Sequence, residues 1–217
     1  MRPQEDLPLG AECAWPIPPK SSVADRIGLA VIALLLAVGA WQAGRGLGSQ
    51  AKAGLAQILI ARAWARTLAG ETAVKPWPWA HTWPVAKLIV PRLGIERYVL
   101  AGADGSAIAF GPGHAGGTAR PGEQGNSVVG GHRDTHLAFL REVRPGDAMV
   151  IERPDKVRVT YRVGRAEILD RRDFLERREF WVIKQAGPTR LTLITHYPFD
   201  ARRAGGPQRY VLLAFLS

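Results

Sequence analysis

The chain of 217 residues is long enough for one ordinary domain with an extension. Hydrophobic residues make up 47% of it and charged residues 22%, which excludes a disordered tail and a protein with many membrane spans. Its one cysteine, Cys13, excludes an intrachain disulfide framework and a thiolate zinc site. The net charge of +10 suits nucleic acid, anionic lipid or anionic cell-wall polymer alike. We set nucleic acid aside, because acidic residues interrupt the densest basic run and no set of stacking aromatics accompanies it.

The N-terminal part predicts a membrane anchor. Residues 1–26 form a polar tail, and the 18 residues from Ile27 to Gly44 carry no charge. As a helix this run is about 27 Å long, close to the hydrocarbon thickness of a bilayer. A cleaved signal peptide and a buried core helix are the alternatives. The acidic tail argues against the former, and we predict an uncleaved transmembrane signal anchor over 27–44.

A stalk and an arm follow the apolar run. Residues 45–74 are predicted to form a stalk helix and linker, with the helix ending near Gly70 and large apolar residues at helical spacing. The apolar face that we expect consists of Leu55, Ile58, Leu59, Ala63 and Leu68. The segment KPWPWAHTWP, residues 75–84, holds too many prolines for a helix or a central strand. It predicts an extended arm that lies on the next domain.

The remainder predicts an all-β domain over residues 75–217. From Val85 onward, short apolar runs alternate with turn residues over about 130 residues, a pattern typical of a small barrel or sandwich. We expect the Gly- and Pro-rich segment Gly111–Gly125 to lack regular structure. The predicted strands are Ala86–Val90, Tyr98–Ala101, Ser127–Gly130, Ala148–Glu152, Val157–Val163, Arg190–Thr195 and Tyr210–Leu216.

Three stretches of this domain resemble sortases. They are KLIVPRLGIERYVLAGA (87–103), GPGHAGGTARPGEQGNSVVGGHRDTH (111–136) and LTLITHYPFDA (191–201). More narrowly, KPWPWAHTWP, HRDTH and YPFDA resemble the Gram-negative branch, the class GN sortases. The resemblance implies a closed barrel of about eight strands on a single N-terminal membrane span in the bacterial inner membrane, with the barrel facing the periplasm.

The resemblance also implies an activity. Sortases are cysteine transpeptidases that cut the C-terminal sorting signal of an exported protein and transfer the acyl group to an amine. We expect a protein substrate with such a signal, an amine acceptor and no cofactor. In this family a thiolate attacks the carbonyl, an imidazolium protonates the leaving amine and an arginine stabilises the oxyanion. His132 matches the family histidine and Arg209 the family arginine.

The nucleophile departs from the family pattern. Where the family has cysteine after a Thr-Leu-x-Thr run, this chain has His196, and Cys13 precedes the membrane run and so lies in the opposite compartment. Thr195 is expected to point to the other face of its strand. An acyl-imidazole is more labile to water than a thioester, so His196 supports slow hydrolysis at best. We therefore predict a sortase whose transpeptidation is lost or impaired.

We place substrate contacts at Thr195, Tyr197 and Asp134, beside the two histidines, and a substrate lip at residues 197–208. We interpret His81 and His114 as structural.

Two rival functions stay open. His132, His136, Asp134 and His196 could hold zinc for a metal-dependent hydrolase, although a strand-to-loop passage does not bring residues four apart together as a helix does. Alternatively, the groove could bind a sorting peptide or scaffold another sortase without cutting.

Overall fold

The computed structural model describes residues 23–170, 187–201 and 205–217, and the side chains of 24, 25, 40 and 42–51 are outside that description. The predicted tail up to residue 22, Cys13, the basic run after residue 170 and part of the predicted substrate lip lie outside the described residues. The chain divides into two compact units, Met1–Ser49 and Gln50–Ser217. Each is described here by itself.

A single helix, α1 (Val23–Leu68), replaces the two helices that we predicted. The glycines near residues 44–48 do not interrupt it. An interior glycine costs a helix only about 1 kcal/mol relative to alanine, and good helix formers flank these positions. Large apolar side chains between Ile27 and Val38 are exposed. In the part of the chain that the structure describes, we find no helix with the length and apolar character needed to span a membrane. The end of the predicted span, residues 42–44, has no described side chains.

The second half of α1 packs on the barrel through a different face from the predicted one. Its buried residues are Ala56, Ile60, Ala63, Trp64 and Thr67. Of the expected face only Ala63 is buried, whereas Leu55 and Ile58 remain 56% and 53% exposed. Small alanines let the helix approach closely, and the Trp64 ring meets Tyr98 at 6.4 Å between centroids. We predicted the buried face from hydropathy alone. The face that is buried in the structure is rotated from it by one residue or more around the helix axis.

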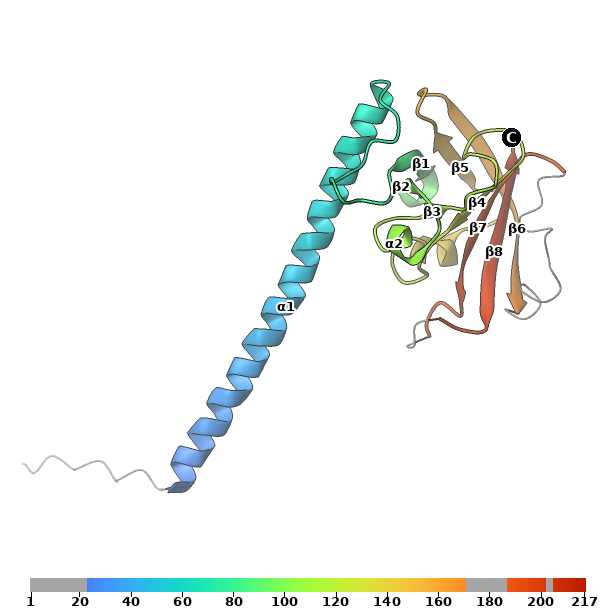
Figure 1. Cartoon of the computed structure of the whole chain (residues 1–217). Coiled ribbons are helices and arrows are strands. Elements are labelled where there is room, and N and C mark those ends of the chain that lie inside the picture. Colours follow the sequence, from blue (N-terminus) through green and yellow to red (C-terminus); the bar gives the residue numbers. More distant parts are fainter. Residues whose placement is uncertain (1–22, 171–186, 202–204) are drawn as a thin grey trace, which may run out of the picture. The chain divides into compact units, whose positions relative to one another are not determined.

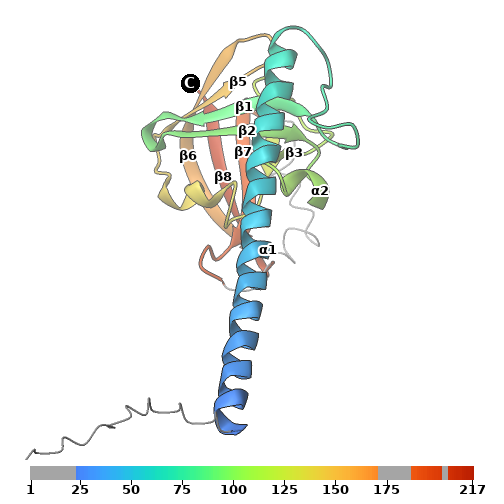
Figure 2. The ribbon, with the colours of Figure 1, turned by 90° about the vertical axis from the view of Figure 1, so that its left-hand side faces the viewer.

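The strands close into one barrel in the order β1-β2-β3-β4-β7-β8-β6-β5 (Figures 1 and 2). The pairs β2–β3 and β4–β7 are parallel and the other pairs are antiparallel. A short helix, α2 (Gly105–Ile108), follows β2. The strands are β1 (Pro84–Val90), β2 (Ile95–Ala101), β3 (Gly113–His114), β4 (Asn126–Gly130), β5 (Ala148–Glu152), β6 (Arg158–Asp170), β7 (Arg190–Tyr197) and β8 (Gln208–Leu216).

The closed all-β barrel confirms the predicted fold class, and all seven predicted strands are present. The eighth strand, β3, lies within Gly111–Gly125, where we expected no regular structure. Its presence depends on Gly113. A Cβ atom there would stand 2.2 Å from the carbonyl oxygen of Gly102, so only glycine allows the backbones to approach and pair. We did not predict this strand, because its segment has a Gly- and Pro-rich composition that is typical of turns.

The segment before β1 behaves as the predicted arm. Residues 75–83 form neither helix nor strand, and Pro84 begins β1. The Trp77 ring packs edge-on against Phe110 at 4.9 Å. The Thr82 hydroxyl donates to the carbonyl of Ala101 at 2.7 Å, and the Ala101 N–H donates to the carbonyl of Trp83 at 2.8 Å. These contacts fasten the arm along β2.

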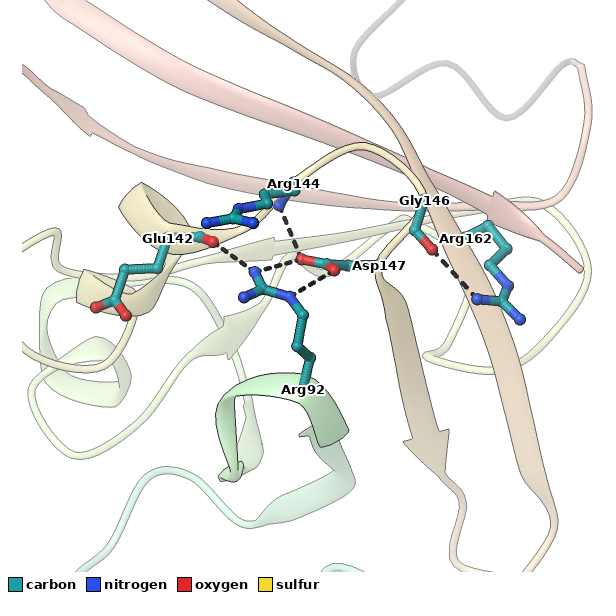
Figure 3. A network of polar contacts seen from close by, with 6 residues as sticks. All are labelled: Arg92, Glu142, Arg144, Gly146, Asp147 and Arg162. Atoms are coloured by element: carbon teal, nitrogen blue, oxygen red, sulfur yellow. Dashed lines mark hydrogen bonds and ion pairs between the residues drawn. The ribbon is translucent and has the colours of Figure 1, made fainter.

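An ion-paired network supplements the apolar core (Figure 3). Arg92 donates from Nε and Nη2 to the two carboxylate oxygens of Asp147, each at 2.7 Å, and also to the carbonyl of Glu142 at 2.6 Å. The N–H of Arg144 donates to Asp147 at 2.8 Å. Hydrogen bonding by Arg92 lowers the pKa of Asp147.

The barrel interior holds fully buried residues that include Leu88, Val129, Leu137, Met149, Ile151, Tyr161, Leu191, Leu193 and Leu212.

Candidate active site

The parallel pair β4–β7 brings the GGHRDT stretch beside the LTLITH stretch. In the register of this pair Gly130 lies opposite Ile194. The pairing continues beyond β4, because the N–H of Gly131 donates to the carbonyl of Ile194 at 3.2 Å. Thr195 then donates from its hydroxyl to the carbonyl of Gly131 at 2.8 Å. His132, two residues beyond the end of β4, therefore follows at the level of His196, the last residue but one of β7.

The antiparallel pair β7–β8 places Arg209 directly opposite His196. Directly opposed residues of an antiparallel pair point to the same face, with Cβ atoms about 4.5–5.5 Å apart. The Arg209 guanidinium donates from Nη1 to the carbonyls of Gly206 at 2.9 Å and Gln208 at 3.0 Å. The three strands thus bring all three predicted catalytic residues, His132, His196 and Arg209, to one end of the barrel.

The predicted substrate contacts differ in accessibility. Thr195 is 2% exposed and its hydroxyl is held by Gly131, so it shapes the strand end and offers no surface to a substrate. Asp134 is exposed in the turn after His132. Tyr197 is half-buried and stacks on Tyr210 at 6.4 Å, and Phe199 meets the Tyr210 ring edge-on at 5.1 Å. Burial raises the pKa of Tyr210.

His136 lies close to His132 but does not complete a metal centre. Its Nε2 is 3.3 Å from the carbonyl of Ala109. Burial lowers the pKa of His136, and electrostatic interactions with Arg97 and His132 lower it further, although the hydrogen bond to Ala109 acts in the opposite direction. Among the described residues, no group of three His, Cys, Asp or Glu side chains is arranged to hold a metal ion.

Arg133 is a site residue that the sequence did not single out. It is only 5% exposed, and its guanidinium donates from Nη1 to the carbonyl of Gly205 at 2.9 Å and from Nη2 to that of Ala201 at 3.0 Å. It thereby ties the turn after β4 to described residues of the β7–β8 connection. Arginine is rarely fully buried, so the residue type alone did not indicate that Arg133 would be buried. Its position directly after His132 in GGHRDT was the available signal.

His114 is structural, as predicted. It is 9% exposed on β3, with Nε2 3.0 Å from the Thr118 hydroxyl and 2.9 Å from the carbonyl of Ala119. Burial lowers its pKa, which favours the neutral ring. His114 therefore holds the Gly-rich loop. His81, also predicted to be structural, is exposed on the arm.

The assembled residues suit acyl chemistry. His132 is partly exposed, two residues beyond the end of β4, and can exchange a proton with a bound peptide. The Arg209 guanidinium offers fixed donors for a developing oxyanion. The position beside both is occupied by the imidazole of His196, and the part of the chain that the structure describes contains no thiol.

Comparison with known proteins identifies the fold. Residues 88–217 match the sortase domain family. Sortase D of Bacillus subtilis (strain 168) is 28% identical over 125 residues, which cover 58% of this chain and 60% of that protein. The chain thus matches less than two thirds of the length of this relative.

Solved sortases share the architecture. A Clostridium perfringens sortase D5 transpeptidase superposes with a TM-score of 0.52 at 22% identity, covering 62% of this chain and 79% of that chain. Sortase C of Clostridium perfringens, solved with the C-terminal cell wall sorting motif, has a TM-score of 0.53 at 17% identity and covers 76% and 89%. With the family match spanning more than half of its residues, this chain belongs to the sortase family.

Proposed function

We propose that this chain is a membrane-attached sortase of the Gram-negative branch that binds the C-terminal sorting signal of an exported protein. Its transpeptidation is lost or impaired because His196 occupies the position of the nucleophilic cysteine. The observation that carries the proposal is the register of β7 with its neighbours. It puts His196 directly opposite Arg209 and at the level of His132, two residues beyond the end of β4.

The substrate class is supported by kinship. A structural relative, sortase C of Clostridium perfringens, was solved with the C-terminal cell wall sorting motif. In this chain Tyr197 and the exposed Asp134 lie one and two residues from the histidines in the sequence, and we propose them as an aromatic and a charged contact for a peptide. Thr195 contributes by holding the strand end.

The expected chemistry follows from the residues present. A ring nitrogen of His196 attacks the scissile carbonyl carbon while Arg209 stabilises the oxyanion. The C–N bond then breaks, and the leaving amine takes a proton from His132. The first product is an acyl-imidazolium, which loses its ring N–H proton to water to give an acyl-imidazole. Water then cleaves this to a free carboxylic acid and releases the His196 imidazole. Because this intermediate hydrolyses readily, an amine acceptor competes poorly and the reaction is slow hydrolysis.

The proposed cellular location rests on the N-terminal run. Ile27–Gly44 is uncharged, and its large side chains, such as Leu34, Leu35 and Leu36, are more than 60% exposed. A helix that is apolar on every side requires a nonpolar environment. We place this run in the bacterial inner membrane and the barrel in the periplasm.

A non-catalytic peptide-binding protein is the second candidate. It is favoured by the preserved frame, in which the barrel is closed and His132, Arg209 and Arg133 are in place, while the nucleophile alone differs. Such a protein recognises a sorting signal, or scaffolds another sortase, without cutting.

The test is a paired assay of the full chain in detergent, as the natural sequence and as His196→Cys. Each is incubated with a fluorogenic peptide that bears a C-terminal sorting motif, with and without an amine acceptor, and products are identified by mass spectrometry. We expect acyl transfer from the cysteine form only, with His196→Ala as the inactive control. Peptide binding without turnover by either form favours the non-catalytic candidate. Turnover by the natural form that a chelator abolishes overturns both.

A further inference from the structure

A hollow lies outside the candidate active site. It has a volume of about 450 Å³ and is lined by the second half of α1, the arm before β1 and the region of α2. All of its lining residues belong to the unit Gln50–Ser217, and none is His132, His196 or Arg209. Its size falls within the range of pockets that hold small ligands.

The walls of this pocket are apolar and held in place. Leu55 and Leu59 come from α1, Trp77 from the arm, and Phe110 from the residues after α2. Trp77 packs edge-on against Phe110 at 4.9 Å. The amide of Gln57 donates to the carbonyl of Phe110 at 2.7 Å, which joins α1 to the far wall. The pocket is therefore built by three segments that brace one another.

The polar side chains that line the pocket are Lys52, His81, Thr82 and Ser106, and together they favour an anion. The hydroxyl of Thr82 is already used by Ala101, and that of Ser106 by Asp104. Lys52 lines the same pocket at its α1 end and forms no ion pair with a described residue. An apolar hollow with one available ammonium group matches a molecule that has a hydrocarbon chain and a negative head.

Two further observations favour a membrane lipid over a soluble amphiphile. Trp79 lines the pocket yet is 75% exposed, and an exposed tryptophan is the residue that prefers the headgroup level of a bilayer. In addition, only residues 45–51 separate the uncharged run from Lys52. Even fully extended, these seven residues span at most about 25 Å. A run embedded in the bilayer would keep the pocket near its surface.

We propose that this pocket binds one acyl chain of an anionic phospholipid, with Leu55, Trp77 and Phe110 around the chain and Lys52 at the headgroup. The inference rests on the proposed membrane attachment of the chain. It gives the α1–arm region a role separate from peptide chemistry: it fixes the barrel at the bilayer surface.

The experiment uses the full chain in bilayer discs that contain phosphatidylglycerol with a photoreactive diazirine in its acyl chain. After illumination, labelled peptides are mapped by mass spectrometry. We expect labels in residues 27–44, which report the membrane attachment, and in residues 52–59 and 77–82, which report the pocket. Discs of zwitterionic phosphatidylcholine with the same diazirine should label the pocket several-fold less.

Matched variants on α1 make the test specific. Leu55 and Ile58 are similarly exposed, but only Leu55 lines the pocket. Leu55→Gln should reduce labelling of residues 77–82 at least threefold, and Ile58→Gln should leave it unchanged. Lys52→Gln should likewise reduce the labelling of residues 77–82. Arg62→Gln should leave this labelling unchanged, because Arg62 is an exposed cation of the same helix that does not line the pocket.

The outcomes separate this inference from the proposed attachment. Labelling of 27–44 without labelling of the pocket overturns the inference and leaves the attachment standing. Equal losses in Leu55→Gln and Ile58→Gln also overturn it, because the label would then report general surface contact. If 27–44 is not labelled, the attachment fails. The pocket is then tested in solution with the short-chain anionic lipid diheptanoyl phosphatidylglycerol carrying the same diazirine. Labelling of the pocket residues by this lipid upholds the inference, and the absence of such labelling overturns it. Labelling of the pocket by a photoreactive sorting peptide, and not by lipid, overturns it in favour of a peptide site.

Discussion

His196 of β7 and Arg209 of β8 are direct partners across an antiparallel ladder. Their side chains lie on the same face of the sheet. A substrate carbonyl that bonds to the side chain of residue 196 is therefore within reach of the Arg209 guanidinium. The relationship is set by backbone register and does not depend on which side chain occupies position 196. A cysteine introduced there would meet the same arginine.

The first prediction concerns that arginine. In the His196→Cys background, Arg209→Ala should lower kcat/KM for the sorting peptide by about 10²–10³, the usual effect of removing one oxyanion donor. Arg209→Lys should be intermediate, because it retains the charge but loses the planar donors. The control is Arg165→Lys, an exposed arginine of β6. Equal activity of all three variants would refute an oxyanion role.

The second prediction concerns Arg133. Its guanidinium satisfies the carbonyls of Ala201 and Gly205 from a buried position. Arg133→Ala should destabilise the fold by about 1–3 kcal/mol, since it removes both hydrogen bonds and leaves a void where the buried guanidinium lay. Urea unfolding measures this, with Arg141→Ala, a more exposed arginine, as the control. A stability equal to that of the control would show that these hydrogen bonds contribute nothing.

The third prediction tests why β3 forms. Gly113→Ala should destabilise the barrel by about 1–3 kcal/mol or more, because the added methyl would meet the backbone of Gly102. Gly116→Ala, in the same loop with open space around its Cβ position, should have little effect. Thermal unfolding of the two variants provides the comparison. A similar midpoint for both would mean that the backbones can separate without cost.

The fourth prediction is a pH dependence. Because hydrogen bonds from Arg92 lower the pKa of Asp147 in the folded protein, the carboxylate stabilises the fold above its unfolded pKa of about 3.9. That contribution is lost as the pH falls through the folded value. Asp147→Asn should lower the thermal midpoint at neutral pH, and the gap to the natural chain should close in acid. Asp155→Asn, in an exposed ion pair with Arg153, should change little at either pH. A gap that persists in acid would contradict the assignment.

Local sequence determined much of the barrel. Short apolar runs bounded by turn residues were sufficient to locate seven strands, because the alternation of apolar and polar side chains along a strand is a property of the local sequence. The same local signals predicted the arm over residues 75–84, of which Pro84 begins β1. Proline has no backbone N–H to donate and disrupts a helix interior, which is why this segment could be recognised from the sequence. The motif around His132 and the departure at His196 were also visible in the sequence, because residue identity is all that they require.

Tertiary structure decided what depends on distant partners. The two residues of β3 form a strand only because Gly113, which has no Cβ atom, leaves room for the carbonyl oxygen of Gly102. The buried face of α1 follows from the contact of Trp64 with Tyr98, which no helical period reveals. The role of Thr195 as an internal donor, the burial of Arg133 and the position of His196 opposite Arg209 all depend on strand register. Register is a relation between segments far apart in the chain, so the sequence alone determined the chemistry available and the fold determined which groups meet.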